Sequence, residues 1–174
     1  MKNKAMESRL SDEVMAFINS RRSLQLASID PEGVPFASYA PFAIGDECLY
    51  VLLSEIALHA INLQSNPTAS VLIIEDEDSA GELFARVRVN YTVRAERIEY
   101  DSQDWHTAMQ ALTERHGERP RNLGEHTDFK MFRLVPERGR YVKGFGKAYT
   151  LAGESLAGEA VDHLRDGHKR RSAA

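Results

Sequence analysis

The chain has 174 residues, of which 43% are apolar, and its formal net charge is −4. This length fits one domain, expected over residues 1–174, and the apolar content is sufficient for a closed core. The negative charge argues against nucleic-acid binding, which needs a basic surface. The apolar runs are too short for membrane insertion, and the N-terminus has no apolar segment of the kind found in signal peptides.

The chain has one cysteine, Cys48, which cannot form an intramolecular disulfide. No spacing of Cys and His resembles a zinc site, so a reducing compartment is the simplest expectation, and we expect the protein to be cytoplasmic. Leu49 and Tyr50 follow Cys48, and these apolar neighbours indicate a thiol that fills the core.

The first expected element is an amphipathic helix that lies across a barrel. Ser11-Asp12-Glu13 is typical of a helix N-terminus. Val14, Phe17 and Ile18 follow at helical spacing and form one apolar stripe.

Extended patterns and turn sequences alternate along the rest of the chain. Asp30-Pro31-Glu32-Gly33 and Gly45-Asp46-Glu47 are turn sequences, and Asn66-Pro67 ends a helix. The sequence predicts a mainly β, α+β fold: a small antiparallel barrel of six or so strands with flanking helices. Its core should span about residues 11–151, followed by a weakly ordered C-terminal arm over about residues 152–174. The expected helices cover residues 55–64 and 101–116, and the expected strands cover residues 24–29, 34–44, 48–53, 69–74, 84–98, 129–134, 140–142 and 145–150.

These patterns alone name no reaction. Glu75-Asp76-Glu77-Asp78 would suit a divalent cation, but a solvated loop is favoured because like charges repel without one. The sequence has no phosphate-binding glycine loop, no serine nucleophile elbow and no pair of metal ligands at helical spacing.

Several strings in order along the chain resemble one family. Together they are similar to the HugZ/HutZ-type haem-utilisation proteins, and the resemblance spans roughly residues 11 to 168. It implies an antiparallel split β-barrel of the pyridoxamine 5'-phosphate oxidase-like, FMN-binding superfamily, and a homodimer with ligand sites at the subunit interface. The strings are Leu24-Gln25-Leu26-Ala27, Ser38-Tyr39-Ala40-Pro41-Phe42, Ile56-Ala57-Leu58-His59-Ala60-Ile61-Asn62-Leu63 with Asn66-Pro67, Ile74-Glu75-Asp76-Glu77, Leu83-Phe84-Ala85-Arg86-Val87-Arg88, Val142-Lys143-Gly144-Phe145-Gly146 and Gly167-His168.

The resemblance implies that His168 ligates haem iron, with His163 as the rival ligand. Asp128 matches the family's partner of this histidine. A carboxylate that accepts the other imidazole N–H fixes the tautomer and raises the basicity of the ligand. The resemblance also implies that Asp128 and His168 come from different subunits.

Other site residues are expected from the same resemblance. Arg88 matches a basic residue near the haem site, where it would pair with a propionate or steady an iron-bound anion. Ser23 stands where relatives usually have threonine, so the hydroxyl is kept and the methyl group is lost. Weaker propionate candidates are Lys143, Lys169 and Arg170, with Arg171 after them.

Three functions remain open. The first is a haem-degrading monooxygenase that releases iron and needs an external electron donor. The second is a haem carrier or storage protein, and the third is an FMN-binding oxidoreductase. Flavin-binding relatives hold the cofactor phosphate with a Ser-x-x-Ser-x-Lys type segment, whereas Ala57 and His59 replace the second hydroxyl and the lysine here. This difference favours haem over FMN.

Overall fold

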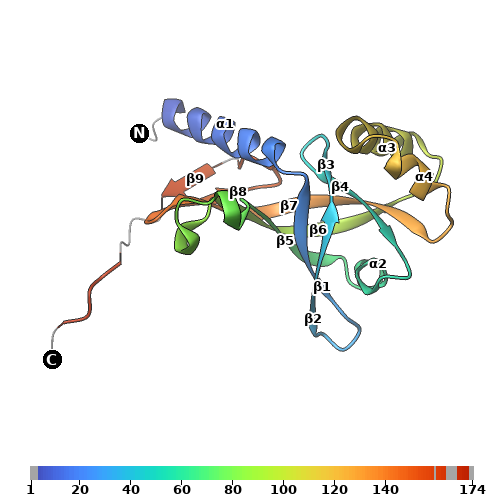
Figure 1. The fold of residues 1–174 in the computed structure, drawn as a ribbon, viewed down its shortest axis with the longest axis horizontal. Helices are drawn as coiled ribbons and strands as arrows, with labels where there is room; N and C mark the ends of the chain where they lie inside the picture. The colour runs from blue at the N-terminus through green and yellow to red at the C-terminus, as the bar shows by residue number, and fades with distance from the viewer. Residues whose placement is uncertain (1–3, 159, 164–167, 173–174) are drawn as a thin grey trace.

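The structure is a computed structural model that describes residues 4–158, 160–163 and 168–172. In this part of the chain, nine strands form one antiparallel sheet and four α-helices lie at its ends and edges (Figure 1). No described helix is long and apolar enough to span a bilayer. In chain order the elements are α1 (Lys4–Ser20), β1 (Ser23–Ile29), β2 (Pro35–Pro41), β3 (Ala43–Ile44), β4 (Leu49–Ser54), α2 (Leu58–Ser65), β5 (Thr68–Ile74), the 3-10 helices η1 (Glu77–Ser79) and η2 (Leu83–Ala85), β6 (Arg88–Ile98), α3 (Gln103–His116), α4 (Arg119–Gly124), β7 (Phe129–Gly144), β8 (Lys147–Ala152) and β9 (Ala160–His163).

The strands follow the order β2-β1-β5-β6-β7-β4-β3, and β8 and β9 extend the sheet from β7. Strand β7 is shared between two halves of the sheet. Its residues 129–134 pair with β4, and its residues 138–144 pair with β8, while β6 pairs with both parts. The predicted antiparallel split barrel with flanking helices is confirmed.

The two strands expected between residues 129 and 142 are the halves of one strand, β7. Opposite Thr92 and Val93 of β6, strand β7 carries one extra residue, Glu137, next to Pro136. A proline cannot donate to a strand ladder, and a β-bulge is one of the places in a sheet that tolerate it. The bulge lies between the two halves, and it allows β7 to exchange β4 for β8 as its partner.

The beginning of the expected C-terminal arm is anchored to the barrel. A Cβ atom on Gly139 would lie 2.7 Å from Cδ1 of the fully buried Tyr91, so glycine permits this close packing. The Tyr91 hydroxyl donates to the carbonyl of Leu156, and the Leu156 N–H donates to the Glu47 carboxylate at 2.9 Å. Strand β9 then pairs with β8, so the arm first rejoins the sheet instead of leaving it.

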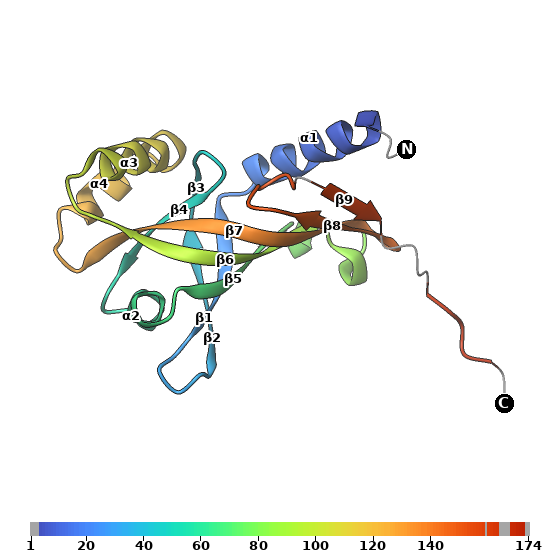
Figure 2. The same ribbon diagram turned by 180° about the vertical axis from the view of Figure 1, so that it is seen from behind.

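Helix α1 already includes Lys4, so the expected helix start at Ser11 was wrong. The buried stripe consists of Leu10, Val14 and Ile18, whereas Phe17 is only partly buried. Because the stripe continues back to Leu10, the helix continues with it, and Ser11 lies in its interior. Figure 2 shows α1 beside β8 and β9, with α3 and α4 at the far end of the sheet.

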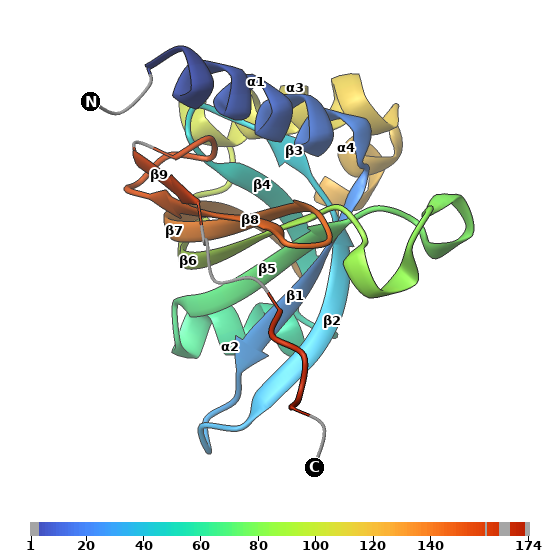
Figure 3. The ribbon, with the colours of Figure 1, turned by 90° about the vertical axis from the view of Figure 1, so that its left-hand side faces the viewer.

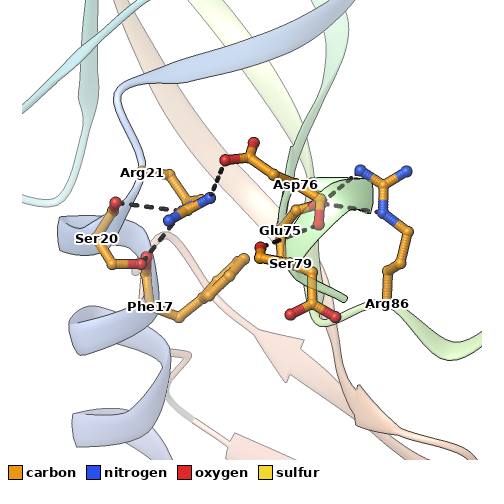
Figure 4. Close-up of polar contacts among 7 residues, drawn as sticks. All are labelled: Phe17, Ser20, Arg21, Glu75, Asp76, Ser79 and Arg86. Carbon is orange, nitrogen blue, oxygen red and sulfur yellow. Dashed lines mark hydrogen bonds and ion pairs between the residues drawn. The ribbon is translucent and has the colours of Figure 1, made fainter. Parts of the chain in front are cut away.

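The strand expected over residues 84–98 begins only at Arg88. Before it, the Glu82 carboxylate accepts the Phe84 N–H at 2.9 Å and fixes the short helix η2. The Arg86 guanidinium donates to the carbonyl of Glu75 (Figure 4). Arg86 therefore closes the neck of a loop and lies outside the strand that begins at Arg88.

This loop contains the acidic run and projects from the sheet (Figure 3). The Asp76 carboxylate pairs with Arg21 at 3.2 Å (Figure 4), and the Glu75 carboxylate accepts the Val87 N–H at 2.7 Å. Among the described residues, no group of three or more acidic, His or Cys side chains is placed to hold a metal ion. Asp76, Glu77 and Asp78 are exposed in this loop.

Two apolar clusters form the core. The larger fills the barrel beneath α1, and the smaller packs α3 against β4 and β7. Cys48 belongs to the smaller cluster and is 1% exposed, which confirms its expected role as core filler.

Candidate functional site

A cavity of about 490 Å³ lies on the outer face of the sheet, between strands β6 to β8 and helix η2. Among the described residues, its lining combines three cationic side chains, several apolar or aromatic groups and one imidazole. The cations are Arg88, Arg140 and Lys147, the apolar groups include Leu72, Phe84, Val142 and Phe145, and the imidazole is that of His168.

The pairing of β6 with β7 explains why two of these cations share a face. Arg88 lies opposite Val142, and Asn90 lies opposite Arg140. Since side chains two residues apart in a strand point to the same face, Arg88 and Arg140 both point into the cavity. Alternation along β7 would have indicated Arg140 once this register was known.

Lys147 reaches the cavity after a tight turn. Phe145 and Gly146 connect β7 to β8, and Gly146 has a φ of 70°, which favours glycine. Phe145 lies in this turn and not in the strand expected over residues 145–150, and Lys147 is not among the expected site residues. The turn instead exposes Phe145, 64% of whose surface is accessible, beside the cavity.

His168 lies against this turn. Its imidazole stacks on the Phe145 ring, with the ring centroids 4.5 Å apart and the planes inclined by 29°. Phe84, which is 90% exposed, lines the same cavity from η2. A flat, largely apolar ligand would therefore meet two aromatic rings and an imidazole.

Asp128 lies immediately before β7 and is partly buried. The Ser54 hydroxyl donates to Oδ2 of Asp128 at 2.5 Å, and the Glu55 N–H donates to the Asp128 carbonyl at 2.8 Å. Both donors come from the end of β4, which pairs with the first residues of β7. The carboxylate is thus fixed at the end of the barrel that carries α3 and α4.

Asp128 and His168 are not brought together within one chain. Asp128 precedes the first residue of β7, whereas His168 contacts the turn after its last residue. A strand of 16 residues rises by roughly 50 Å at about 3.3 Å per residue. Figure 1 shows the α4–β7 connection and the C-terminal segment at opposite ends of the molecule.

Lys143 points away from the cavity. Its ammonium group pairs with the Glu13 carboxylate of α1 at 3.2 Å and lies over the Tyr149 ring. Val142 and Gly144, on either side of Lys143 in the chain, line the cavity instead. Lys143 therefore ties α1 to the sheet.

The other expected residues lie around the cavity or beyond it. Ser23 is exposed at the start of β1, on the face of Gln25 and Ala27, which line a second cavity of about 490 Å³. The two cavities share Leu72 and Asn90. Lys169 and Arg170 are exposed after His168, whereas Gly167 lies outside the described residues. His163, the rival ligand, belongs to β9, where its Cα pairs with that of Tyr149.

The segment that would hold a flavin phosphate is used differently here. The Ser54 hydroxyl is directed to Asp128, and His59 Nδ1 lies 2.9 Å from the Ser38 hydroxyl. Burial lowers the pKa of His59 from its ordinary value of 6.5, so the ring is neutral at pH 7. A neutral imidazole supplies no positive charge to a phosphate.

The shared strand β7 defines a split-barrel protein, and the outer face of its sheet carries a cavity lined by cations and apolar groups. Residues 10–143 match the family model of pyridoxamine 5'-phosphate oxidase, and the chain belongs to this family. Heme oxygenase HutZ of Vibrio cholerae serotype O1 is 43% identical over 174 residues, which cover 99% of this chain and 97% of that protein.

Solved structures give the same fold. HutZ of Vibrio cholerae, described there as a haem storage protein, has a TM-score of 0.71 and 44% identity over 74% of this chain and 90% of that one. ChuZ of Campylobacter jejuni has a TM-score of 0.84 and 27% identity over 95% of this chain and 67% of that one.

Proposed function

We propose that this protein binds haem in the cavity between β6, β7, β8 and η2 and cleaves it oxidatively to release iron. The observation that carries the proposal is the combination of an imidazole, three cations and apolar walls in one cavity. Haem has the matching chemistry: an iron that accepts imidazole, two carboxylates and a flat apolar ring. The similarity to the HutZ haem oxygenase supports the same ligand.

In this proposal each group has one task. His168 ligates the iron through a neutral imidazole nitrogen. Arg88, Arg140 and Lys147 pair with the propionates, assisted by Lys169 and Arg170. Phe84 and Phe145 pack against the ring and exclude water. Bound haem supplies the activation of dioxygen at its iron, with electrons from an external donor.

We further propose that the working unit is a homodimer in the cytoplasm. Asp128 lies too far from His168 of its own chain to accept the imidazole N–H, so it would serve His168 of the partner subunit. A symmetric dimer would then contain two sites, each built from both subunits.

Mixing two impaired variants, one without the iron ligand and one with slow turnover, tests this arrangement. In a mixed dimer of His168→Ala and Asp128→Asn, one site keeps both native residues and the other loses both. Random exchange at equal amounts makes half of the dimers mixed, so about a quarter of the wild-type turnover should return. No recovery after verified exchange of subunits would contradict a site shared between them.

Haem binding itself is tested by titration of His168→Ala, which should lose the Soret shift at low haem concentration. His106→Ala is the matched control, because His106 is an exposed histidine of α3 that pairs with Asp101, which precedes the helix. An unchanged titration of His168→Ala would move the ligand to His163 or indicate nonspecific binding.

An FMN-binding oxidoreductase of the same fold is the competing function. It would give a yellow protein with no Soret band on addition of haem. The neutral His59 and the engaged Ser54 hydroxyl disfavour it, since neither offers a charged clamp for the phosphate.

A further inference from the structure

We infer that Ser54 is a positioning residue that holds the Asp128 carboxylate in the orientation needed to accept the imidazole N–H of His168 of the partner subunit. This inference rests on the proposed function and deepens it. Its basis is a hydrogen-bond chain that runs from the backbone of residue 56 through Ser54 to Asp128.

The direction of this chain follows from the donors and acceptors. The Ile56 N–H donates to the Ser54 hydroxyl oxygen at 3.1 Å, and the same hydroxyl donates to Oδ2 of Asp128 at 2.5 Å. A serine hydroxyl has a single proton. Once its oxygen accepts from Ile56, that proton is directed to the carboxylate.

The backbone of the same segment holds Asp128 at a second point. The Glu55 N–H donates to the Asp128 carbonyl at 2.8 Å, and Ser54 pairs with Phe129 as the last residue pair between β4 and β7. The main chain and the side chain of Asp128 are therefore both fixed by the end of β4. Fixed groups of this kind lose less entropy when a partner binds.

One carboxylate oxygen remains for a partner. Within the described residues, Oδ2 is bonded to Ser54 and Oδ1 has no hydrogen bond in the chain. A carboxylate can accept at both oxygens. Ser54 thus presents Oδ1, which is where the N–H of the partner's His168 would donate.

The assignment also explains why the Ser54–His59 segment keeps its first serine but lacks a lysine. In this chain the serine hydroxyl serves a carboxylate, not a phosphate. The segment that would clamp an anion in a flavin protein instead orients the group that polarises an iron ligand.

The first test uses the haem-free protein. Three-bond couplings in NMR report the χ1 rotamer of Asp128, which should be single in the wild type and in Ser54→Thr, since threonine keeps the hydroxyl. Ser54→Ala should give averaged couplings. Ser65→Ala is the control, because the exposed Ser65 hydroxyl bonds to the Ile61 carbonyl within α2. A single Asp128 rotamer in Ser54→Ala would overturn the inference.

The second test uses the haem-loaded protein in its ferrous state. The iron–histidine stretching band of Ser54→Ala should move more than half of the way to that of Asp128→Asn, and Ser54→Thr should restore the wild-type position. Adding Ser54→Ala to Asp128→Asn should cause no further shift, since both act through one carboxylate. A wild-type band in Ser54→Ala would also overturn the inference.

The two proposals fail in different ways. If the wild type gives no saturable Soret band, haem binding fails while the rotamer test of Ser54 still stands. If Asp128→Asn leaves the iron–histidine band unchanged in a protein that binds haem, Asp128 does not act on the ligand, and the role of Ser54 in the site is wrong.

Discussion

The imidazole of His168 stacks on the ring of Phe145, with centroids 4.5 Å apart. His168 belongs to the exposed C-terminal segment, whereas Phe145 is fixed in the turn between β7 and β8. The stack therefore places the proposed iron ligand beside the cavity before any ligand arrives. Such ordering lowers the entropy lost on binding.

Phe145→Leu should weaken haem binding because the stack is lost while an apolar side chain remains. Aromatic pairs contribute about 0.5–1.5 kcal/mol, which corresponds to about a 2- to 10-fold rise in Kd. Phe145→Tyr should bind haem as the wild type does. Titration by absorbance measures both, and equal or tighter binding by Phe145→Leu would show that the stack does not order His168.

Lys147→Ala should weaken haem binding more than Lys143→Ala. Lys147 lines the cavity, whereas Lys143 is paired with Glu13 of α1. An exposed charge pair contributes up to about 1 kcal/mol, so the Kd for haem should rise about 2- to 5-fold in Lys147→Ala. As the salt concentration decreases, the Kd of Lys147→Ala should fall less steeply than that of the wild type. If Lys143→Ala weakened haem binding more than Lys147→Ala, the propionate contact would be assigned to Lys143.

Asp128→Asn should keep haem affinity within about tenfold of the wild type and slow ring opening by about 10- to 100-fold. The amide retains the size of the side chain but loses the charge that polarises the ligand. Ascorbate-driven loss of the Soret band in air measures the rate. Unaltered turnover would remove Asp128 from the mechanism.

His59 should make the free energy of unfolding depend on pH. Burial lowers the pKa of His59 below 6.5, so below that pH the unfolded chain binds the proton more readily than the folded one. Stability present near pH 7.5 should therefore decrease as the pH falls through 6.5 towards the folded-state pKa.

His59→Asn isolates this contribution, since the amide can replace Nδ1 in the hydrogen bond with Ser38. Urea unfolding at pH 7.5 and pH 5.5 should show a larger loss of stability in the wild type than in the variant. A larger loss in the variant would mean that His59 gains a proton on folding and would reverse the assigned direction.

Much of the fold follows from local patterns in the sequence. The hairpin at Asp30-Pro31-Glu32-Gly33 forms as predicted, with Oδ1 of Asp30 accepting the N–H groups of Glu32 and Val34. The helix predicted over residues 101–116 is α3, Gln103–His116, with Ser102 as its N-cap. In these regions, propensity and turn chemistry agree with the tertiary structure.

The differences from expectation concern features that depend on packing between segments far apart in the sequence. Residues 129–134 and 140–142 were expected to form two strands, but the bulge beside Pro136 allows one strand, β7, to serve both halves of the barrel. Lys143 was expected as a weaker propionate candidate, but its ammonium group pairs with the Glu13 carboxylate of α1. Neither the register nor the partner strand can be read from a single segment.

The candidate site likewise contains some residues that the sequence indicated and others that only the structure reveals. The resemblance supplied His168, Asp128 and Arg88, and the structure places two of these at one cavity. Arg140 and Lys147 were not predicted, because their position at the cavity depends on the pairing of β6, β7 and β8. Ser54 begins the segment that holds a phosphate in flavin-binding relatives, and only the pairing of β4 with β7 connects it to Asp128.

A haem titration of the purified protein, followed in the same cuvette by ascorbate under air, tests the central claim most directly. We predict a saturable Soret band at one haem per subunit that then bleaches as the ring opens. A band that persists under ascorbate would contradict haem cleavage and indicate a carrier or storage protein. The absence of any saturable band would contradict haem binding altogether.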